Sequence, residues 1–198
     1  QLVKAELDED GYIIVPEPGS YTLKAIKATN TTYFVSAGGS DENDGLTADT
    51  ALASVAKAVE KANSKGLNAN DTVDIKATGT ITWGTLPAYD YTLNIESLDS
   101  TSKASVAIGT VTGDLSFDNI NITNTSYITI LGNSIKLGEN VSLSSSAIIQ
   151  LADGTTSLTY PEPVNVIINN AFSGTIHMGH NGQRSPTYAE DVNIIVNN

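Results

Sequence analysis

The spacing of apolar residues changes near residue 71. Between residues 51 and 65, apolar side chains recur every three or four positions, as on one face of a helix. Asp49 or Thr50 stands where an N-cap is expected, and Gly66 stands where a helix ends. The recurring positions are Leu52, Val55, Ala56, Val59 and Ala62. The pattern predicts one helix at about 51–65, preceded by a short strand over 32–36.

From residue 71 onward, a triplet of an apolar, a small polar and an apolar residue recurs at spacings of 20, 27, 21, 23 and 28 residues. A strand that returns at a period in the twenties is typical of a β-solenoid, in which stacked coils bury an apolar ladder. The triplets are Val73-Asp74-Ile75, Leu93-Asn94-Ile95, Ile120-Asn121-Ile122, Val141-Ser142-Leu143, Val164-Asn165-Val166 and Val192-Asn193-Ile194.

These patterns predict an all-β fold, a right-handed parallel β-helix of about six coils with an N-terminal hairpin and one capping helix. An antiparallel β-sandwich is the alternative, because it also has short strands at regular intervals. A sandwich requires neither a recurrent triplet nor a helix at its start, so the solenoid is favoured. The coils are expected over about 71–198, within a β-helix domain over 31–198 that is truncated at its C-terminal end.

The first 30 residues have a different pattern. Runs that favour strands at 12–15 and 21–26 flank Pro16-Glu17-Pro18-Gly19, which indicates a hairpin. We expect a cover segment over 1–30; the last hairpin of a preceding immunoglobulin-like module is the alternative.

The opening of the predicted β-helix resembles a known family. The run from Tyr33 to Gly45 and the Ala-rich helix after it resemble the N-terminal end of right-handed parallel β-helices of the pectate-lyase-like superfamily. The run Gly113 to Ile122, turning at Asp118-Asn119, is similar to a coil of that family. The chain further resembles β-helix modules in large surface proteins of Gram-positive gut bacteria, which implies a secreted or cell-surface location.

Composition excludes several partners. The net charge is −12 and 16% of residues are charged, so the chain lacks the basic surface that nucleic-acid binding requires. Cysteine is absent, which excludes disulfides and thiolate metal sites. No apolar run approaches the about 18 residues of a membrane span, so no membrane insertion is expected.

Clustered oxygen ligands follow the first strand. Asp41, Asn43 and Asp44 offer carboxylates and an amide of the kind that binds Ca²⁺, although their spacing is not that of an EF-hand. Turn formation and helix capping explain the same residues and are favoured. No diffusible cofactor is expected, and calcium is the alternative.

A second candidate site is aromatic. Trp83, Tyr89, Asp90 and Tyr91 lie in the segment after the first coil. Exposed aromatic faces pack on sugar rings while a carboxylate bonds the hydroxyl groups, which suggests glycan binding. Packing of Trp83 and one tyrosine against the N-terminal hairpin explains the same residues and is favoured.

The family's enzymes act on polysaccharides from the outer face of one sheet, which allows a test of catalysis. If the apolar members of each triplet point inward, the outer positions carry charge only in the first two coils. Asp74, Lys76 and Glu96 are explained more simply as exposed ion-pair partners than as an acid and base group. The remaining outer residues are Asn94, Asn121, Thr123, Ser142, Ser144, Asn165, Ile167, Asn193 and Ile195.

Two features of the C-terminal part stand apart. His177, His180 and Arg184, the last being the only arginine, fall in an irregular stretch with no evident role. Asn94, Asn121, Asn165 and Asn193 are expected to form an amide ladder. Outward Ile167 and Ile195 suggest that further coils, a following module or a second copy cover this end.

The sequence therefore favours a non-catalytic surface or adhesion module that contacts a polysaccharide or host glycan. The alternative is the N-terminal part of a polysaccharide lyase or glycoside hydrolase.

Overall fold

A computed structural model describes residues 6–7, 13–14, 30–132, 134–151, 159–160, 163–169, 174–178, 187–188 and 190–197. Parallel strands dominate this part of the chain, and it holds one α-helix, α1 (Val55–Asn63). The strands are β1 (Glu6–Leu7), β2 (Ile13–Ile14), β3 (Asn30–Ser36), β4 (Thr72–Thr78), β5 (Thr80–Ile81), β6 (Thr92–Ser97), β7 (Ala104–Val106), β8 (Leu115–Asp118), β9 (Ile120–Ile122), β10 (Tyr127–Thr129), β11 (Ser134–Leu137), β12 (Ser142–Leu143), β13 (Ile148–Gln150), β14 (Thr159–Tyr160), β15 (Val164–Ile168), β16 (Thr175–His177), β17 (Thr187–Tyr188) and β18 (Val192–Val196).

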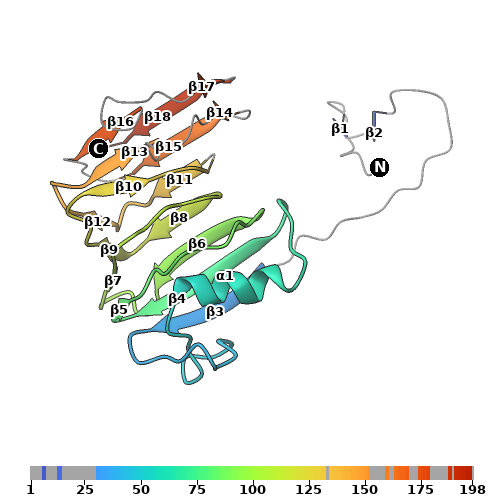
Figure 1. Cartoon of the computed structure of the whole chain (residues 1–198), viewed down its shortest axis with the longest axis vertical. Coiled ribbons are helices and arrows are strands. Elements are labelled where there is room, and N and C mark those ends of the chain that lie inside the picture. Colours follow the sequence, from blue (N-terminus) through green and yellow to red (C-terminus); the bar gives the residue numbers. More distant parts are fainter. Residues whose placement is uncertain are drawn as a thin grey trace.

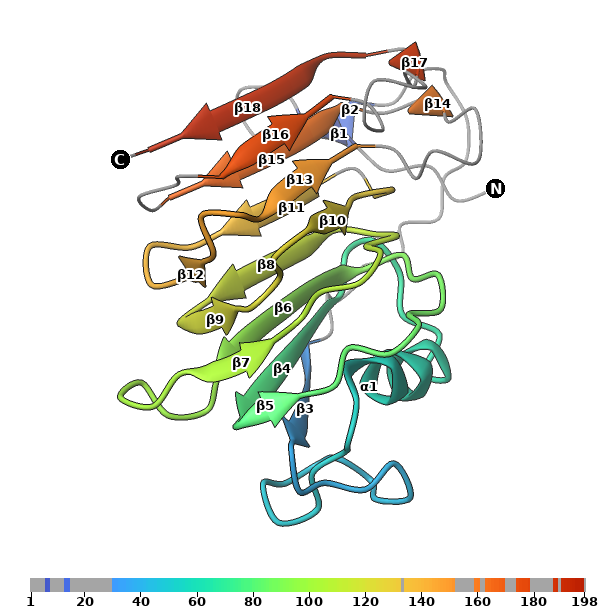
Figure 2. The ribbon, with the colours of Figure 1, turned by 60° about the vertical axis from the view of Figure 1, so that its left-hand side comes forward.

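The largest sheet has seven strands in the order β18-β15-β11-β8-β6-β4-β3, and all its pairings are parallel. A four-stranded sheet, β12-β9-β7-β5, and a three-stranded sheet, β10-β13-β16, are also parallel. In each sheet, spatial order follows chain order, so the strands rise in layers from β3 to β18 (Figures 1 and 2). The expectation of a mostly β chain with parallel strands is confirmed. This arrangement is compatible with a β-helix. The parallel pairings exclude the antiparallel sandwich.

The prediction that the triplets occupy one strand position in successive coils was wrong, because they lie in two different sheets. The triplet at 120–122 forms β9, and Ser142 and Leu143 form β12, so both belong to the four-stranded sheet. The seven-stranded sheet continues instead through β8 and β11. Strands of every parallel sheet share the same apolar alternation, so a triplet identifies a strand without identifying its sheet.

Alternate residues of the seven-stranded sheet form two apolar rows that point into the core. Members of both rows from β4 to β15 are at most 2% exposed. One row is Val73, Leu93, Leu115, Ile135 and Val166, and the other is Ile75, Ile95, Phe117, Leu137 and Ile168. Burial of such side chains contributes about 1.5–3 kcal/mol each to folding, so these rows hold the layers together.

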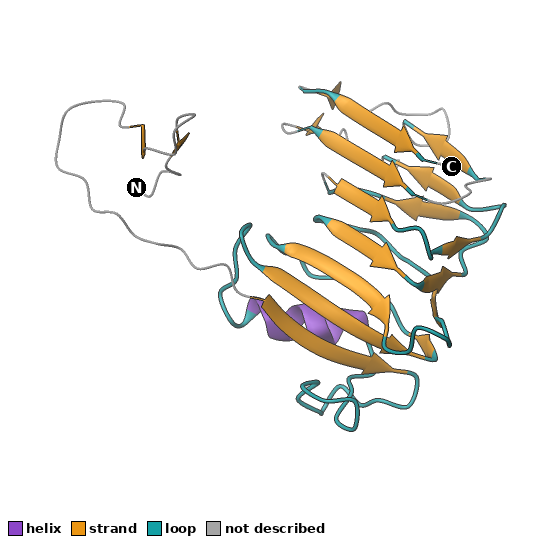
Figure 3. Ribbon diagram, turned by 180° about the vertical axis from the view of Figure 1, so that it is seen from behind, coloured by secondary structure: helices purple, strands orange, loops and turns teal. Residues whose placement is uncertain are grey.

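The β3 end of the stack is covered by the chain itself. Val55, Ala58, Val59 and Ala62 of α1 are fully buried, and the helix lies against the first strands (Figure 3). Backbone bonds join β3 to the following loop, among them Phe34 N–H to Gly45 O (2.8 Å) and Ser36 N–H to Leu52 O (2.9 Å). A Cβ at residue 39 would lie 2.1 Å from Leu52 O, so only glycine permits this close approach. The expected helix and the expected strand over 32–36 are confirmed.

The predicted N-terminal hairpin lies mostly outside the described residues. β2 falls within the run at 12–15, and its partner is β1, with Glu6 opposite Ile14 in an antiparallel pair. The run at 21–26 and the Pro-Gly turn lie outside the described residues, so the expected pairing of 12–15 with 21–26 stays a prediction.

Candidate functional site

The strand register places polar side chains in rows on the outer face of the seven-stranded sheet. Two neighbouring rows run from β3 to β18 across this face. The first is Thr32, Asp74, Asn94, Ser116, Lys136, Ile167 and Ile195, and the second is Phe34, Lys76, Glu96, Asp118, Gly138, Asn169 and Asn197.

A groove of about 490 Å³ lies over these rows. It is lined by residues of β4, β6, β8 and β11, of the turn after β11, and by Asn169, which follows β15. Its polar and charged lining residues are Asp74, Asn94, Glu96, Ser116, Asp118, Lys136, Glu139, Asn140 and Asn169. The expectation that the middle strands of this face are neutral was therefore wrong, because β8 and β11 contribute Asp118 and Lys136.

At the β4 and β6 end of the groove, the charged side chains are already paired. Asn94 Nδ2 donates to Asp74 Oδ1 at 2.9 Å. Lys76 Nζ forms an ion pair with Glu96 Oε1, and both side chains are about one third exposed (32% and 40%). This pair matches the simpler explanation offered by the sequence. The hydrogen bond and the ion pair together engage one polar atom of each of these four side chains.

At the β8 and β11 end, the charged groups are less engaged. Asp118 Oδ1 accepts a bond from the neighbouring Asn119 N–H at 2.9 Å. The side chains of Lys136 and Glu139 are exposed and form no hydrogen bond or ion pair with another described residue. A Cβ at residue 138 would lie 2.7 Å from Asp118 Oδ1. Gly138 therefore leaves the Asp118 carboxylate room between two strands, in a groove also lined by Lys136 and Glu139, whose side chains have no partner among the described residues.

Glu96 and Asp118 face each other across neighbouring strands. Adjacent parallel strands lie about 4.8 Å apart, so the two carboxylates belong to one part of the groove. Like charges at such positions repel unless a cation or a ligand lies between them. Lys76 pairs with Glu96 from the strand on its other side, β4, and compensates the charge of Glu96 without lying between the two carboxylates.

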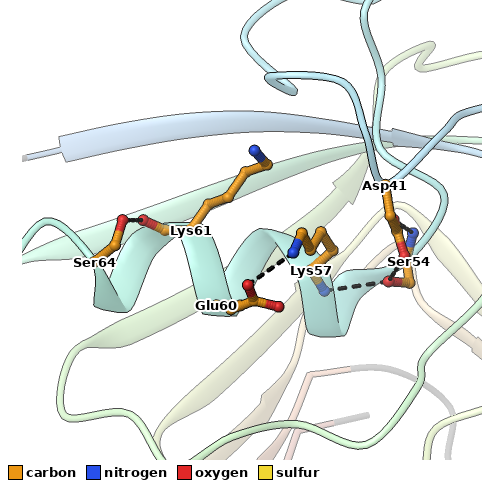
Figure 4. A network of polar contacts seen from close by, with 6 residues as sticks. All are labelled: Asp41, Ser54, Lys57, Glu60, Lys61 and Ser64. Carbon is orange, nitrogen blue, oxygen red and sulfur yellow. Dashed lines mark hydrogen bonds and ion pairs between the residues drawn. The ribbon is translucent and has the colours of Figure 1, made fainter.

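The three residues predicted as calcium ligands form the loop that precedes α1. Asp41 Oδ1 accepts from Ala53 N–H (2.9 Å) and Ser54 N–H (3.1 Å), and its Oδ2 accepts from the Ser54 hydroxyl (Figure 4). Asn43 Nδ2 donates to Ala51 O at 2.9 Å. These contacts account for both side chains without an ion, as the capping alternative proposed.

Asp44 is held in the same way. Its Oδ1 accepts from Leu46 N–H (3.0 Å) and from the Thr50 hydroxyl (2.6 Å). These bonds, the Leu46 amide first, lower the pKa of Asp44 below its ordinary value of 3.8. Across the described ranges, no group of three or more histidine, aspartate or glutamate side chains is arranged to hold a metal ion. Calcium binding stays a prediction.

The four residues predicted to contact glycans do not form an exposed platform. Trp83, Tyr89 and Tyr91 are 5%, 9% and 3% exposed, and only Asp90 is at the surface. Trp83 packs near Phe117 with ring centres 6.1 Å apart, and the rings of Tyr89 and Tyr91 are 5.1 Å apart. The burial removes the exposed ring faces on which this prediction was based.

The buried tyrosines connect α1 to the sheet. Tyr91 donates its hydroxyl to Val59 O of α1, and Tyr89 donates to Asp114 O just before β8, both at 3.3 Å. Desolvation raises the pKa of both phenols. The three aromatic rings of the segment therefore pack in the core, whereas Asp90 stays at the surface.

His177 lies on β16, with its ring 6.3 Å from that of Tyr127. His180 and Arg184 lie outside the described residues. The asparagine ladder is shorter than expected: Asn193 donates to Asn165 at 3.0 Å, and Asn197 donates to Asn169 at 2.8 Å. Asn121 lies in another sheet, and Asn94 bonds Asp74 instead.

The sequence interpretation missed Asp118, Lys136 and Glu139. One signal could have found them: Ile75, Ile95, Phe117 and Leu137, which share one core row, are spaced 20, 22 and 20 residues apart. That spacing is more regular than the triplet spacing.

Among the described residues, no helix is both long and apolar enough to cross a bilayer. Comparison with protein-family models, curated proteins and solved structures finds no match.

Proposed function

We propose that this chain is a non-catalytic glycan-binding module of a secreted or cell-surface protein, built as a right-handed parallel β-helix of about six coils. Three parallel sheets whose strands follow one another in chain order support the β-helix. The resemblance of residues 33–45 to the opening of pectate-lyase-like proteins supports the same architecture and an extracellular role.

The groove on the seven-stranded sheet is the observation that carries the binding proposal. It crosses several strands, and amides, hydroxyls and carboxylates line it. Such groups hydrogen-bond the hydroxyls of a sugar chain that lies across the layers. Asp118, Lys136 and Glu139 are the principal contacts, because they are the charged lining residues that bond no side chain of another described residue.

A glycan array followed by calorimetry, with and without calcium, tests this proposal. Asp118→Asn and Lys136→Ala should each weaken binding by about 10- to 100-fold, since hydrogen bonds to charged groups contribute about 1.5–3 kcal/mol. Lys57→Ala is the matched control, because Lys57 forms an exposed ion pair with Glu60 on α1 outside the groove. Absence of any glycan ligand, or equal affinity in all three variants, would contradict the proposal.

The adjacency of Glu96 and Asp118 favours a second candidate, a glycoside hydrolase or polysaccharide lyase. Retaining hydrolases use two carboxyl groups about 5–5.5 Å apart, close to the spacing of neighbouring strands. Against this, Glu96 is partly exposed and paired with Lys76, whereas a general acid is ordinarily kept protonated by apolar burial.

An activity assay separates the two candidates. The chain is incubated with acidic and neutral polysaccharides, and both new reducing ends and unsaturated products are followed. The binding module should give no product. Turnover that disappears in Glu96→Gln and in Asp118→Asn would establish the enzyme instead.

A further inference from the structure

The strand β18 is the last strand of the seven-stranded sheet, and among the described strands it pairs only with β15. Asp191 O and Asn197 N–H point toward β15, because they bond Val164 N–H (3.0 Å) and Ile168 O (2.8 Å). Backbone groups alternate in direction along a strand, so the N–H and C=O groups of Val192, Ile194 and Val196 point away from the sheet. No other described strand bonds these groups, which leaves them positions at which another strand can pair.

The side chains of β18 are mostly apolar, like those of β15, the strand that it pairs with. Ile194 and Val196 continue the two core rows, yet they are 41% and 43% exposed. Val166 and Ile168, one layer below in the same rows, are fully buried. On the outer face, Ile195 is 46% exposed and stacks on Ile167, which confirms the outward orientation expected from the sequence.

The edge also lacks the features that prevent pairing. Natural edge strands are usually protected by lysine, proline or a bulge, and residues 192–197 contain no charged residue and no proline. At the opposite end, the loop at 45–52 bonds the β3 edge. The chain itself therefore bonds the β3 edge of the sheet, whereas no described strand bonds the outer edge of β18.

The sequence of β18 is nearly symmetric about Ile195. In an antiparallel pair of two copies centred there, Ile195 faces Ile195, and Asn193 faces Asn197 on the same outer face. On the inner face, Ile194 faces Val196, and these two residues have the free backbone groups, so they form the hydrogen-bonded pairs. A register centred on Ile194 would place Asn193 opposite Ile195 and lose this match.

We propose that β18 is a dimerisation edge, which pairs antiparallel with β18 of a second copy of this chain about a two-fold axis at Ile195. The pairing joins the two seven-stranded sheets into one, adds a bonded backbone partner to each edge and covers Ile194 and Val196. Because a two-fold contact closes on itself, the assembly stops at two copies.

The net charge of −12 on each copy opposes association, and salt screens this repulsion. Sedimentation of the full chain should therefore show a dimer whose dissociation constant falls as salt rises. Ile195→Lys should raise that constant at least tenfold without changing the circular dichroism spectrum. The control, Ile167→Lys, lies in the same outer row one strand further in and should keep the dimer.

Cysteine scanning tests the register, because the chain contains no cysteine. Ile195→Cys should form a disulfide-linked dimer on mild oxidation, since opposed residues of a non-hydrogen-bonded pair lie about 4.5 Å apart between Cα atoms. Asn193→Cys alone should not, because the two copies of residue 193 lie about 14 Å apart along the strands. Combining Asn193→Cys with Asn197→Cys should restore cross-linking. Leu46→Cys, in an exposed loop at the β3 end, is the control for random collision.

Three results would overturn the proposal: a monomer at all concentrations and salt levels, cross-linking of Asn193→Cys alone, or growth into larger oligomers. The last would indicate head-to-tail stacking of β18 on β3 of another copy.

Discussion

At the residue scale, the loop before α1 is organised by carboxylates that accept bonds from the chain. Asp41 bonds two backbone amides and one hydroxyl, and Asp44 bonds one of each. Aspartate accepts such bonds best when ionised, so the contribution of Asp44, whose pKa is lowered, to the stability of the loop depends on pH.

Asp44→Asn tests this dependence. The folded pKa of Asp44 lies below the ordinary value of 3.8, chiefly because of the Leu46 amide. Its contribution to stability is therefore complete above the unfolded pKa and is lost as pH falls through the folded pKa. Thermal melting should show the native chain more stable than Asp44→Asn at pH 6, with a difference that vanishes at strongly acidic pH.

The control for that comparison is Asp49→Asn. Asp49 lies in the same loop, is exposed and makes no hydrogen bond with another described residue. Its variant should melt with the native chain across the same pH range. A constant difference between the native chain and Asp44→Asn at every pH would show that the charge of Asp44 does not matter.

At the element scale, α1 illustrates how far the pattern of the sequence determines structure. Helical spacing predicted a helix at 51–65, and the helix occupies 55–63. The N-cap is Ser54 rather than Asp49 or Thr50, because residues 45–52 are held by bonds to β3 instead of starting the helix. The capping bond is local, but the point at which the chain leaves β3 depends on tertiary contacts.

Ser54→Ala should weaken the attachment of α1. The Ser54 hydroxyl accepts from Lys57 N–H at 3.1 Å and donates to Asp41 Oδ2 at 3.0 Å (Figure 4). Loss of a serine N-cap costs about 0.5–2 kcal/mol, and the loss of its bond to Asp41 favours the upper part of that range. Denaturation by urea measures the change. Ser64→Ala is the control, since Ser64 is exposed at the other end of α1 and should change stability by less than about 0.5 kcal/mol.

At the scale of the whole molecule, the sequence predicted the kind of layering but not the assignment of strands to sheets. Alternation identified the segments at 73–75, 93–95, 164–166 and 192–194 as strands, and all four lie in the seven-stranded sheet. The segments at 120–122 and 141–143 have the same alternation but follow a turn into another sheet. That turn is set by backbone geometry, such as the positive φ of 45° at Asn119, which apolar spacing does not encode.

Recognising the candidate groove requires that each strand be assigned to the correct sheet. Asp118 and Lys136 enter the groove only when β8 and β11 are recognised as neighbours of β6. The packing partners of Trp83 and Tyr91 were missed for a related reason: the sequence suggested the N-terminal hairpin, but Trp83 packs near Phe117 of β8 and Tyr91 bonds Val59 of α1. Burial in a layered fold is decided by what lies above and below a segment, which is information from distant parts of the chain.

A layered fold also predicts how the cost of one substitution varies along the stack, since each layer contacts only its neighbours. Ile135 and Ile194 occupy the same core row on β11 and β18 and are 1% and 41% exposed. Ile135→Ala should cost about 2–5 kcal/mol by leaving a cavity, whereas Ile194→Ala should cost less than about 1 kcal/mol in the monomer. Urea denaturation at low protein concentration measures both.

At concentrations that favour the β18 dimer, the cost of Ile194→Ala should rise, because the second copy covers this side chain, while that of Ile135→Ala should not change. Equal costs at both positions would contradict the layered account of stability, and a concentration-independent cost at Ile194 would count against the proposed edge.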